Sequence, residues 1–194
     1  MRTHLPRSLL CLLFAVLVPP VMAQSVTILS GGSDAHACSV SARLSGTLSP
    51  NVSELAACDR AIDDLHISNR DRAGTFVNRG ILLTALGSWQ EALNDYNRAL
   101  ELMPALPQAF NGKGNIYFIA ERYDDAIAAY QQALALDLQE KHIAYYNLGL
   151  THDQLHDAPA AEQHYRLALD AAPEWVLPQQ KLAARAAAAP SQKQ

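Results

Sequence analysis

Three histidines near the C-terminus, His152, His156 and His164, are the residues with the clearest capacity for chemistry. His152 and His156 are four residues apart, a spacing that places both imidazoles on one helix face, where two such rings can bind a metal ion. The zinc-protease pattern also needs a glutamate after the first histidine; Asp153 stands there, and the spacing fixes no third ligand. A metal-dependent enzyme that uses His152 and His156 is therefore our third hypothesis, and we expect no metal.

Other motifs of catalytic proteins are incomplete in this chain. Asn111-Gly112-Lys113-Gly114 lacks the first glycine and the final serine or threonine of a phosphate-binding loop. The sequence contains no G-x-S-x-G element of a serine hydrolase. We therefore predict a protein that is not an enzyme and that carries no cofactor.

Composition and charge exclude further classes. Hydrophobic residues make up 49% of the 194 residues, which is too high a share for a disordered chain. The 33 alanines favour helices over strands. The net charge is −4 and the lysines and arginines do not cluster, so we expect no binding to nucleic acid.

Residues 1–23 have the pattern of a secretory signal peptide. Its parts are Arg2 and Arg7, the apolar core Leu9 to Val18, and the small residues Val21 and Ala23. The apolar core is too short to span the roughly 30 Å of a bilayer. We expect cleavage between Ala23 and Gln24, export to the periplasm or out of the cell, and no membrane-spanning segment after removal of the leader.

Two cysteines remain once the leader is removed, Cys38 and Cys58. In an oxidising compartment such a pair is expected to form a disulfide. The alternative is two unrelated buried thiols, each packed as a small hydrophobic side chain.

Four columns of small and aromatic residues recur at spacings of 34 and 35 residues. The columns are Gly80, Gly114 and Gly149; Ala92, Ala126 and Ala161; Tyr96, Tyr130 and Tyr165; and Ala99, Ala133 and Ala168. Within one copy the last three columns stand at i, i+4 and i+7, which is one helix face. Ser88 with Glu91, and Asp157 in the third copy, are expected to cap the second helix of a pair.

These columns resemble those of the tetratricopeptide repeat family. The first copy reads Phe76, Arg79-Gly80, Leu83, Ala92, Tyr96, Ala99 and Pro104, and the other two copies follow it with Leu138 in place of the second proline. The resemblance implies an all-α fold, a short right-handed α-solenoid of helix hairpins closed by a C-terminal capping helix. It places the repeats at 73–106, 107–141 and 142–175, the capping helix at 176–189 and a tail at 190–194.

Upstream of the repeats, the same register predicts a flexible lead-in at 24–34 and a degenerate helical unit with its linker at 35–72. Projected backwards, the register puts Cys38 at the place of Phe76 and Cys58 at that of Tyr96. Those columns belong to facing helices in the family, so the resemblance allows a disulfide that replaces part of an aromatic core.

In this family the first helices of the repeats line a concave groove that receives a peptide or a partner helix. The resemblance therefore implies a set of binding residues on those helices: Asn78, Gln108, Asn111, Asn115, Phe118, Tyr146, Asn147 and Asp153. One subclass binds a C-terminal carboxylate through lysines, but Val77 and Ile143 occupy the places where lysine is needed, so no such clamp is expected.

Our leading hypothesis is a non-catalytic adaptor that binds a protein or peptide of the cell envelope in this groove and remains a monomer. The alternative is a structural protein that assembles end to end through its terminal helices.

Overall fold

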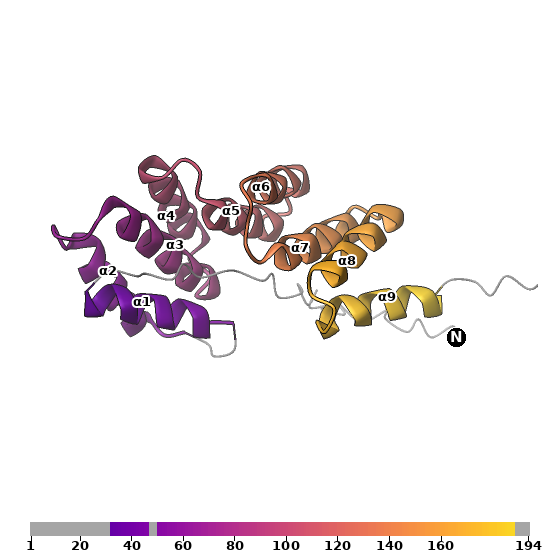
Figure 1. Ribbon diagram of the computed structural model, residues 1–194, viewed down its shortest axis with the longest axis horizontal. Helices are drawn as coiled ribbons and strands as arrows, with labels where there is room; N and C mark the ends of the chain where they lie inside the picture. Colours follow the sequence, from indigo (N-terminus) through magenta and orange to yellow (C-terminus); the bar gives the residue numbers. More distant parts are fainter. Residues whose placement is uncertain (1–31, 47–49, 189–194) are drawn as a thin grey trace, which may run out of the picture.

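A computed structural model describes residues 32–46 and 50–188 (Figure 1). Within these ranges the chain forms helices and no strand: α1 (Ser33–Leu44), the 3₁₀ turn η1 (Val52–Glu54), α2 (Leu55–Asp63), α3 (Asn69–Ala85), α4 (Trp89–Leu102), α5 (Pro107–Ile119), α6 (Tyr123–Ala135), α7 (Lys141–Gln154), α8 (Ala158–Ala171) and α9 (Val176–Ala188). The signal peptide predicted at 1–23 and the tail predicted at 190–194 lie outside the described residues.

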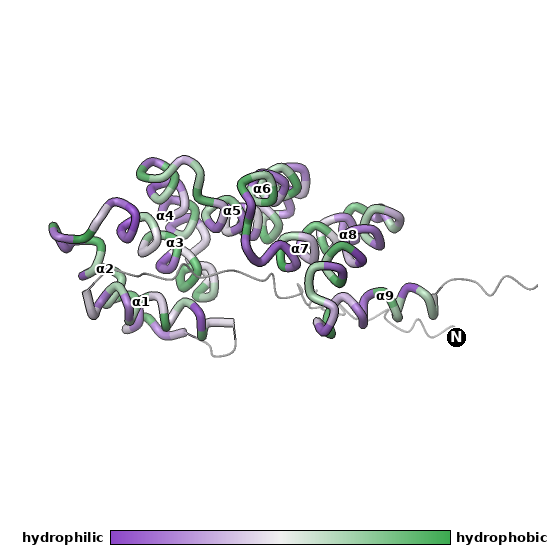
Figure 2. Tube along the Cα trace, in the orientation of Figure 1, coloured by the Kyte–Doolittle hydropathy of each residue, from purple (hydrophilic) through white to green (hydrophobic). Residues whose placement is uncertain are grey.

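The helices pair in the order of the chain. Hairpins α3/α4, α5/α6 and α7/α8 pack one after another, with α1/α2 before them and α9 after them. Figure 1 shows this row running from α1 and α2 at one end to α9 at the other. Each helix carries both hydrophobic and hydrophilic residues, as expected of amphipathic helices in a stack (Figure 2). The protein is all-α, a short right-handed α-solenoid, as the repeat predicts.

The glycine and tyrosine columns explain how each hairpin closes. Tyr96, Tyr130 and Tyr165 are fully buried, and each ring lies against the glycine of the facing helix. A Cβ atom added to Gly114 would stand 2.5 Å from Cε1 of Tyr130, a distance that real contacts do not allow. The glycine spacing of 34 and 35 residues is thus set by a tyrosine ring that occupies the space of a missing side chain.

The first helix of each hairpin ends in the same way. The residues after these helices, Gly87, Glu121 and His156, have φ angles of 81°, 58° and 58°. Backbone N–H groups of the next residues bond back to the helix, for example Ser88 to the carbonyl of Leu83 at 2.9 Å. This is a Schellman ending, which requires a left-handed residue and explains His156 as a helix terminator.

The two predicted helix caps have different outcomes. Asp157 caps α8 by accepting a hydrogen bond from the backbone N–H of Ala160 at 3.2 Å, as expected. The capping box expected from Ser88 and Glu91 is wrong, because the Ser88 side chain makes no capping bond to α4. Its backbone N–H instead closes the end of α3 by bonding to the carbonyl of Leu83.

Some helices begin outside the predicted ranges. α1 begins at Ser33, inside the predicted lead-in, and α3 begins at Asn69, before the predicted start of the first repeat at 73. Ser68 caps α3 by accepting from the N–H of Asp71 at 3.1 Å and by donating to its carboxylate at 2.7 Å. The cap extends α3 by one turn towards α2.

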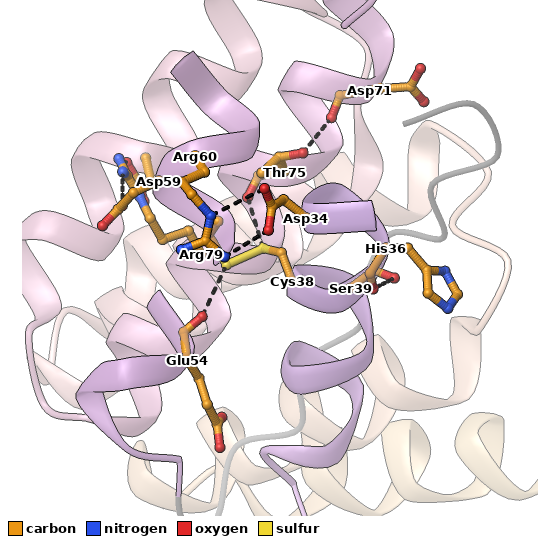
Figure 3. Close-up of a disulfide and its surroundings, with 12 residues drawn as sticks. Asp34, His36, Cys38, Ser39, Glu54, Asp59, Arg60, Asp71, Thr75 and Arg79 are labelled. Carbon is orange, nitrogen blue, oxygen red and sulfur yellow. Dashed lines mark hydrogen bonds and ion pairs between the residues drawn. A yellow bond between two sulfur atoms is a disulfide. The ribbon is translucent and has the colours of Figure 1, made fainter. Parts of the chain in front are cut away.

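The N-terminal hairpin is held by a disulfide. Cys38 of α1 and Cys58 of α2 are joined with their Cα atoms 4.9 Å apart, and both are fully buried (Figure 3). On the outer side, the Arg60 guanidinium donates two hydrogen bonds to the Asp34 carboxylate, at 2.7 and 3.1 Å. The bridge lies in the same apolar core as Val77 of α3, so it ties the first unit to the repeats.

None of the helices in the described part of the chain is long and apolar enough to cross a membrane.

Candidate functional site

The predicted binding residues lie on α3, α5 and α7, the first helices of the three hairpins. α5 packs against both α3 and α7, so these helices stand next to one another, and we call them the first-helix row. Most of the predicted residues are nevertheless buried between helices rather than open to solvent. Those exposed by 4% or less are Asn78, Asn111, Asn115, Phe118, Tyr146 and Asn147, whereas Gln108 and Asp153 are partly exposed.

Two of the buried amides hold helices together. Asn115 of α5 accepts hydrogen bonds from the Tyr130 hydroxyl of α6 at 2.9 Å and from the Asn147 amide of α7 at 3.1 Å. Burial raises the pKa of Tyr130 well above 10, so the hydroxyl remains a donor at all physiological pH values. Asn78 also has an interaction partner. The sequence analysis predicted that Asn115 and Asn147 contact a ligand, whereas in the structure they connect α5 to α7.

Asn111 differs from the other buried asparagines. It is 0% exposed, and neither its amide nitrogen nor its amide oxygen has a hydrogen-bond partner among the described residues. Gln108 stands three residues earlier on α5, and its buried Oε1 also lacks a partner within the described ranges. Buried amide groups are almost always hydrogen-bonded in folded proteins, so an exception is a place where a further group can bind.

The aromatic residues of the predicted set pack against other rings. Phe118 meets Tyr123 edge to face with ring centroids 5.9 Å apart. Tyr146 lies between Tyr165 and Trp175, at centroid distances of 5.6 and 4.9 Å. Trp175 comes from the link between α8 and α9 and was not among the predicted residues. Its position at the last place of the third repeat is the signal that a search of repeat ends would have used.

Asp153 is engaged by the last helix. Its carboxylate accepts a hydrogen bond from the Tyr165 hydroxyl at 2.6 Å and pairs with Arg185 of α9. Lys181 of α9 lies 3.9 Å away. Asp153 therefore fastens α9 to the third hairpin.

The two places that a carboxylate clamp needs hold no lysine. Val77 is fully buried and Ile143 is partly buried at the two places where a carboxylate clamp needs lysine. Lys113 is the one charged residue in the α5 sequence, and desolvation lowers the pKa of its ammonium group. A ligand at these two places therefore meets apolar side chains instead of a lysine clamp.

His152 pairs with His164 rather than with His156. His152 stacks on His164 of α8 with ring centroids 5.2 Å apart, whereas His156 is exposed at the end of α7. The described part of the chain contains no group of three or more His, Cys, Asp or Glu side chains that could hold a metal ion. The arrangement that the third hypothesis needs is therefore not found in residues 32–46 and 50–188.

Arg79, which stands in the leucine column of the repeat, has a structural role that the sequence did not reveal. Its guanidinium donates two hydrogen bonds of 2.7 Å to Asp95 of α4 and one of 2.7 Å to Asp59 of α2. The bonds to Asp95 raise the pKa of Arg79, and Arg79 bridges the disulfide-linked hairpin to the first repeat. The signal was a charged residue in a column that is apolar in the family.

Two profiles of one family match this chain. The profile described as "TPR repeat" matches residues 80–118, and the one described as "Tetratricopeptide repeat" matches residues 105–174. Curated relatives include human tetratricopeptide repeat protein 13, 37% identical over 81 residues, and the lipoprotein NlpI homolog of Haemophilus influenzae, 35% identical over 71 residues. The matches cover 42% and 37% of this chain but only 9% and 23% of those proteins.

Solved structures show the same fold over more of the chain. MamA of Desulfovibrio magneticus, from residue 41 to its end, has a TM-score of 0.57 at 24% identity. The match covers 79% of this chain and 84% of the MamA chain. YrrB, described as a TPR protein with an unusual peptide-binding site, has a TM-score of 0.56 at 24% identity, covering 65% and 62%. The first TPR of Spaghetti, bound to the HSP90 peptide SRMEEVD, has a TM-score of 0.57 at 20% identity, covering 64% and 98%.

Proteins with these repeats generally mediate interactions between proteins. The two profile matches together extend from Gly80 of α3 to the residues just after α8, and so they span the glycine and tyrosine columns. Over residues 80–174 the chain is similar to proteins of the tetratricopeptide repeat family.

Proposed function

We propose that this chain is a non-catalytic adaptor of the bacterial cell envelope that binds an extended protein segment at Gln108 and Asn111 on α5. The single observation that carries the proposal is the buried amide of Asn111, whose donor and acceptor both lack a partner among the described residues. The envelope location rests on the predicted leader and on the disulfide between Cys38 and Cys58, which persists in an oxidising compartment.

The chemistry of a side-chain amide matches that of a peptide backbone. An asparagine offers two N–H donors and one carbonyl acceptor, which is what a peptide group needs for two hydrogen bonds. Gln108 lies one turn before Asn111 on the same helix face, and its side chain is partly exposed while its Oε1 is buried. A bound segment therefore enters at Gln108, near the start of α5, and reaches Asn111 by displacing the side chains that cover it.

The neighbouring helices indicate the chemistry of the bound segment. The residues that align with Asn111 and Asn115 in the repeat are apolar on both sides: Val77 and Ile81 on α3, and Tyr146 and Leu150 on α7. Because Val77 and Ile143 stand where a carboxylate clamp needs lysine, the segment is held through its backbone and apolar side chains rather than through a charged C-terminus.

The experiment uses residues 24–194 and a displayed library of nine-residue peptides. Enriched peptides are synthesised with a fluorophore, and their dissociation constants are measured by anisotropy for the wild type, Asn111→Leu and the control Asn97→Leu, which changes an exposed asparagine of α4. Loss of the amide is expected to weaken binding about tenfold or more, since two hydrogen bonds are worth about 1.4 kcal/mol or more. The peptide SRMEEVD is the negative control.

Three results would contradict the proposal: no enriched peptide, equal affinity of the wild type and Asn111→Leu, or tight binding of SRMEEVD. The last result would identify a carboxylate site that the described residues do not show.

A second candidate function is end-to-end assembly. It is favoured by apolar residues that are exposed near both ends of the row of helices. Val52 and Leu65 are 73% and 89% exposed, and Val176 at the start of α9 is 53% exposed. Sedimentation velocity over a hundredfold range of concentration separates the two functions, because the adaptor remains a monomer and the assembling protein grows with concentration.

A further inference from the structure

His152 and His164 form a stacked pair between the helices of the third hairpin. Their rings are 5.2 Å apart with an interplanar angle of 13°, one from α7 and one from α8. The ring of Tyr145 stacks on His164 at 6.4 Å and 22°. The equivalent places in the second hairpin hold Tyr117 and Ala129, so the pair is particular to the third.

The ring nitrogens of the pair have few hydrogen-bond partners among the described residues. Nδ1 of His152 and Nδ1 of His164 are both buried and have no hydrogen-bond partner within the described ranges. The Asp157 carboxylate lies 3.6 Å from Nδ1 of His152, too far for a hydrogen bond but near enough to attract a positive charge. A charge on His164, whose ring is stacked on that of His152, meets both burial and repulsion.

Burial and two nearby charges change the pKa of His164. Burial lowers the pKa of His164 below its ordinary value of 6.5; the charge of His152 lowers it further, and Asp157 partly opposes the shift. Three other helices pack against α7 and α8. α5 carries Lys113, α6 exposes Asp124 and Asp125 in its first turn, and Lys181 and Arg185 of α9 are held at Asp153.

We infer that the His152–His164 stack makes the third hairpin sensitive to pH, so that mild acid separates α7 from α8 and releases α9. The coupling to α9 is direct, because Asp153 follows His152 in α7 and holds Arg185. The first two hairpins lack the pair and remain packed. Acid therefore opens one end of the solenoid before the rest.

The sign of the effect follows from proton linkage. Because the folded chain has the lower pKa at His164, the unfolded chain takes up the proton first as the pH falls. The pair's contribution to stability is fully present above pH 6.5 and is lost as the pH falls below that value. Each extra proton bound by the unfolded state raises the equilibrium constant for unfolding by at most about tenfold per pH unit.

The test compares urea unfolding curves from pH 8 to pH 5 for three proteins. These are the wild type, the double variant His152→Tyr/His164→Ala, which copies the second hairpin, and His156→Asn, which changes an exposed histidine and tolerates its φ of 58°. His164→Gln is a second variant that removes the titration and keeps a polar side chain. The acid-dependent slope below pH 6.5 is expected to shrink in the double variant and in His164→Gln, and to stay unchanged in His156→Asn.

Hydrogen exchange measured by mass spectrometry locates the change. At pH 5.5, after correction for intrinsic rates, peptides from 141–188 are expected to lose protection in the wild type and to retain it in the double variant, while peptides from 69–102 stay protected in both. Equal acid slopes in the wild type and the double variant overturn the inference, and so does a loss of protection that is uniform along the chain.

Discussion

Two asparagines on the same helix provide a direct test of how the first-helix row is stabilised. Asn111 and Asn115 both lie on α5, one turn apart, and both are buried. Replacing either with leucine keeps the branching of the side chain and removes its polar atoms. Both changes bring the same increase in volume, with a crowding cost of about 1–3 kcal/mol, so the difference between the variants isolates the hydrogen bonds.

Asn115→Leu is expected to destabilise the fold strongly. The change removes the acceptor of the Tyr130 hydroxyl, 2.9 Å away, and of the Asn147 amide, 3.1 Å away. Depriving a buried donor of its acceptor costs about 1–3 kcal/mol, so the free energy of unfolding falls by about 2–6 kcal/mol for the two bonds, before crowding is added.

Asn111→Leu is expected to have the opposite effect on the polar balance. Its amide is desolvated without a hydrogen-bond partner among the described residues, and replacing it recovers about 1–3 kcal/mol. That gain offsets the crowding cost, so this variant unfolds close to the wild type. The two variants should therefore differ by at least about 3 kcal/mol.

Urea unfolding at pH 8, followed by circular dichroism at 222 nm without reductant, measures the difference. Asn111→Ala and Asn115→Ala repeat the comparison without crowding. If Asn111 and Asn115 variants lose the same stability in both series, then the amide of Asn111 is bonded in solution and the argument for a binding site at this residue fails.

Two further predictions concern the disulfide of the N-terminal hairpin and the left-handed residues that follow α3 and α5. The variant Cys38→Ala/Cys58→Ala, which opens a loop with a sequence separation of 20, should lower the free energy of unfolding by about 3 kcal/mol. Reductant should have no further effect on the melting temperature of this variant. An unchanged melting temperature on reduction of the wild type contradicts a formed bridge. Glu121→Gly should raise stability by about 1 kcal/mol and Gly87→Ala should lower it by about as much, since their φ angles are 58° and 81°; thermal unfolding of both variants checks this, and a shift of the same sign in both refutes it.

The sequence was a good guide wherever a residue type has one packing role. Glycine opposite tyrosine at a period of 34 or 35 predicts the hairpins, because each tyrosine needs the space that a missing side chain leaves. The left-handed helix ends were also within reach of the register, since Gly87 aligns with Glu121 and His156. They were missed because the residue type changes from glycine to glutamate and histidine.

Polar residues were harder to assign. An asparagine on a first helix of a repeat can bond to a neighbouring helix or face a ligand, and periodicity is the same in both cases. Asn115 was predicted to contact a ligand, and the structure joins it to Tyr130 and Asn147. The histidines show the same limit, because the spacing of His152 and His156 on one helix hides the contact with His164 on the next.

The sequence by itself determined the helices, their order and the small and aromatic residues at which they pack, because these depend on local propensity and on a repeat that spans many residues. The tertiary structure alone decided which polar side chains are satisfied and which are not. A hydrogen bond needs its two atoms within about 3 Å, and that distance depends on how neighbouring hairpins stack. Asn111, which has no hydrogen-bond partner in the described part of the chain, and Asn115, which has two, lie one turn apart on α5 and are the clearest result of that stacking.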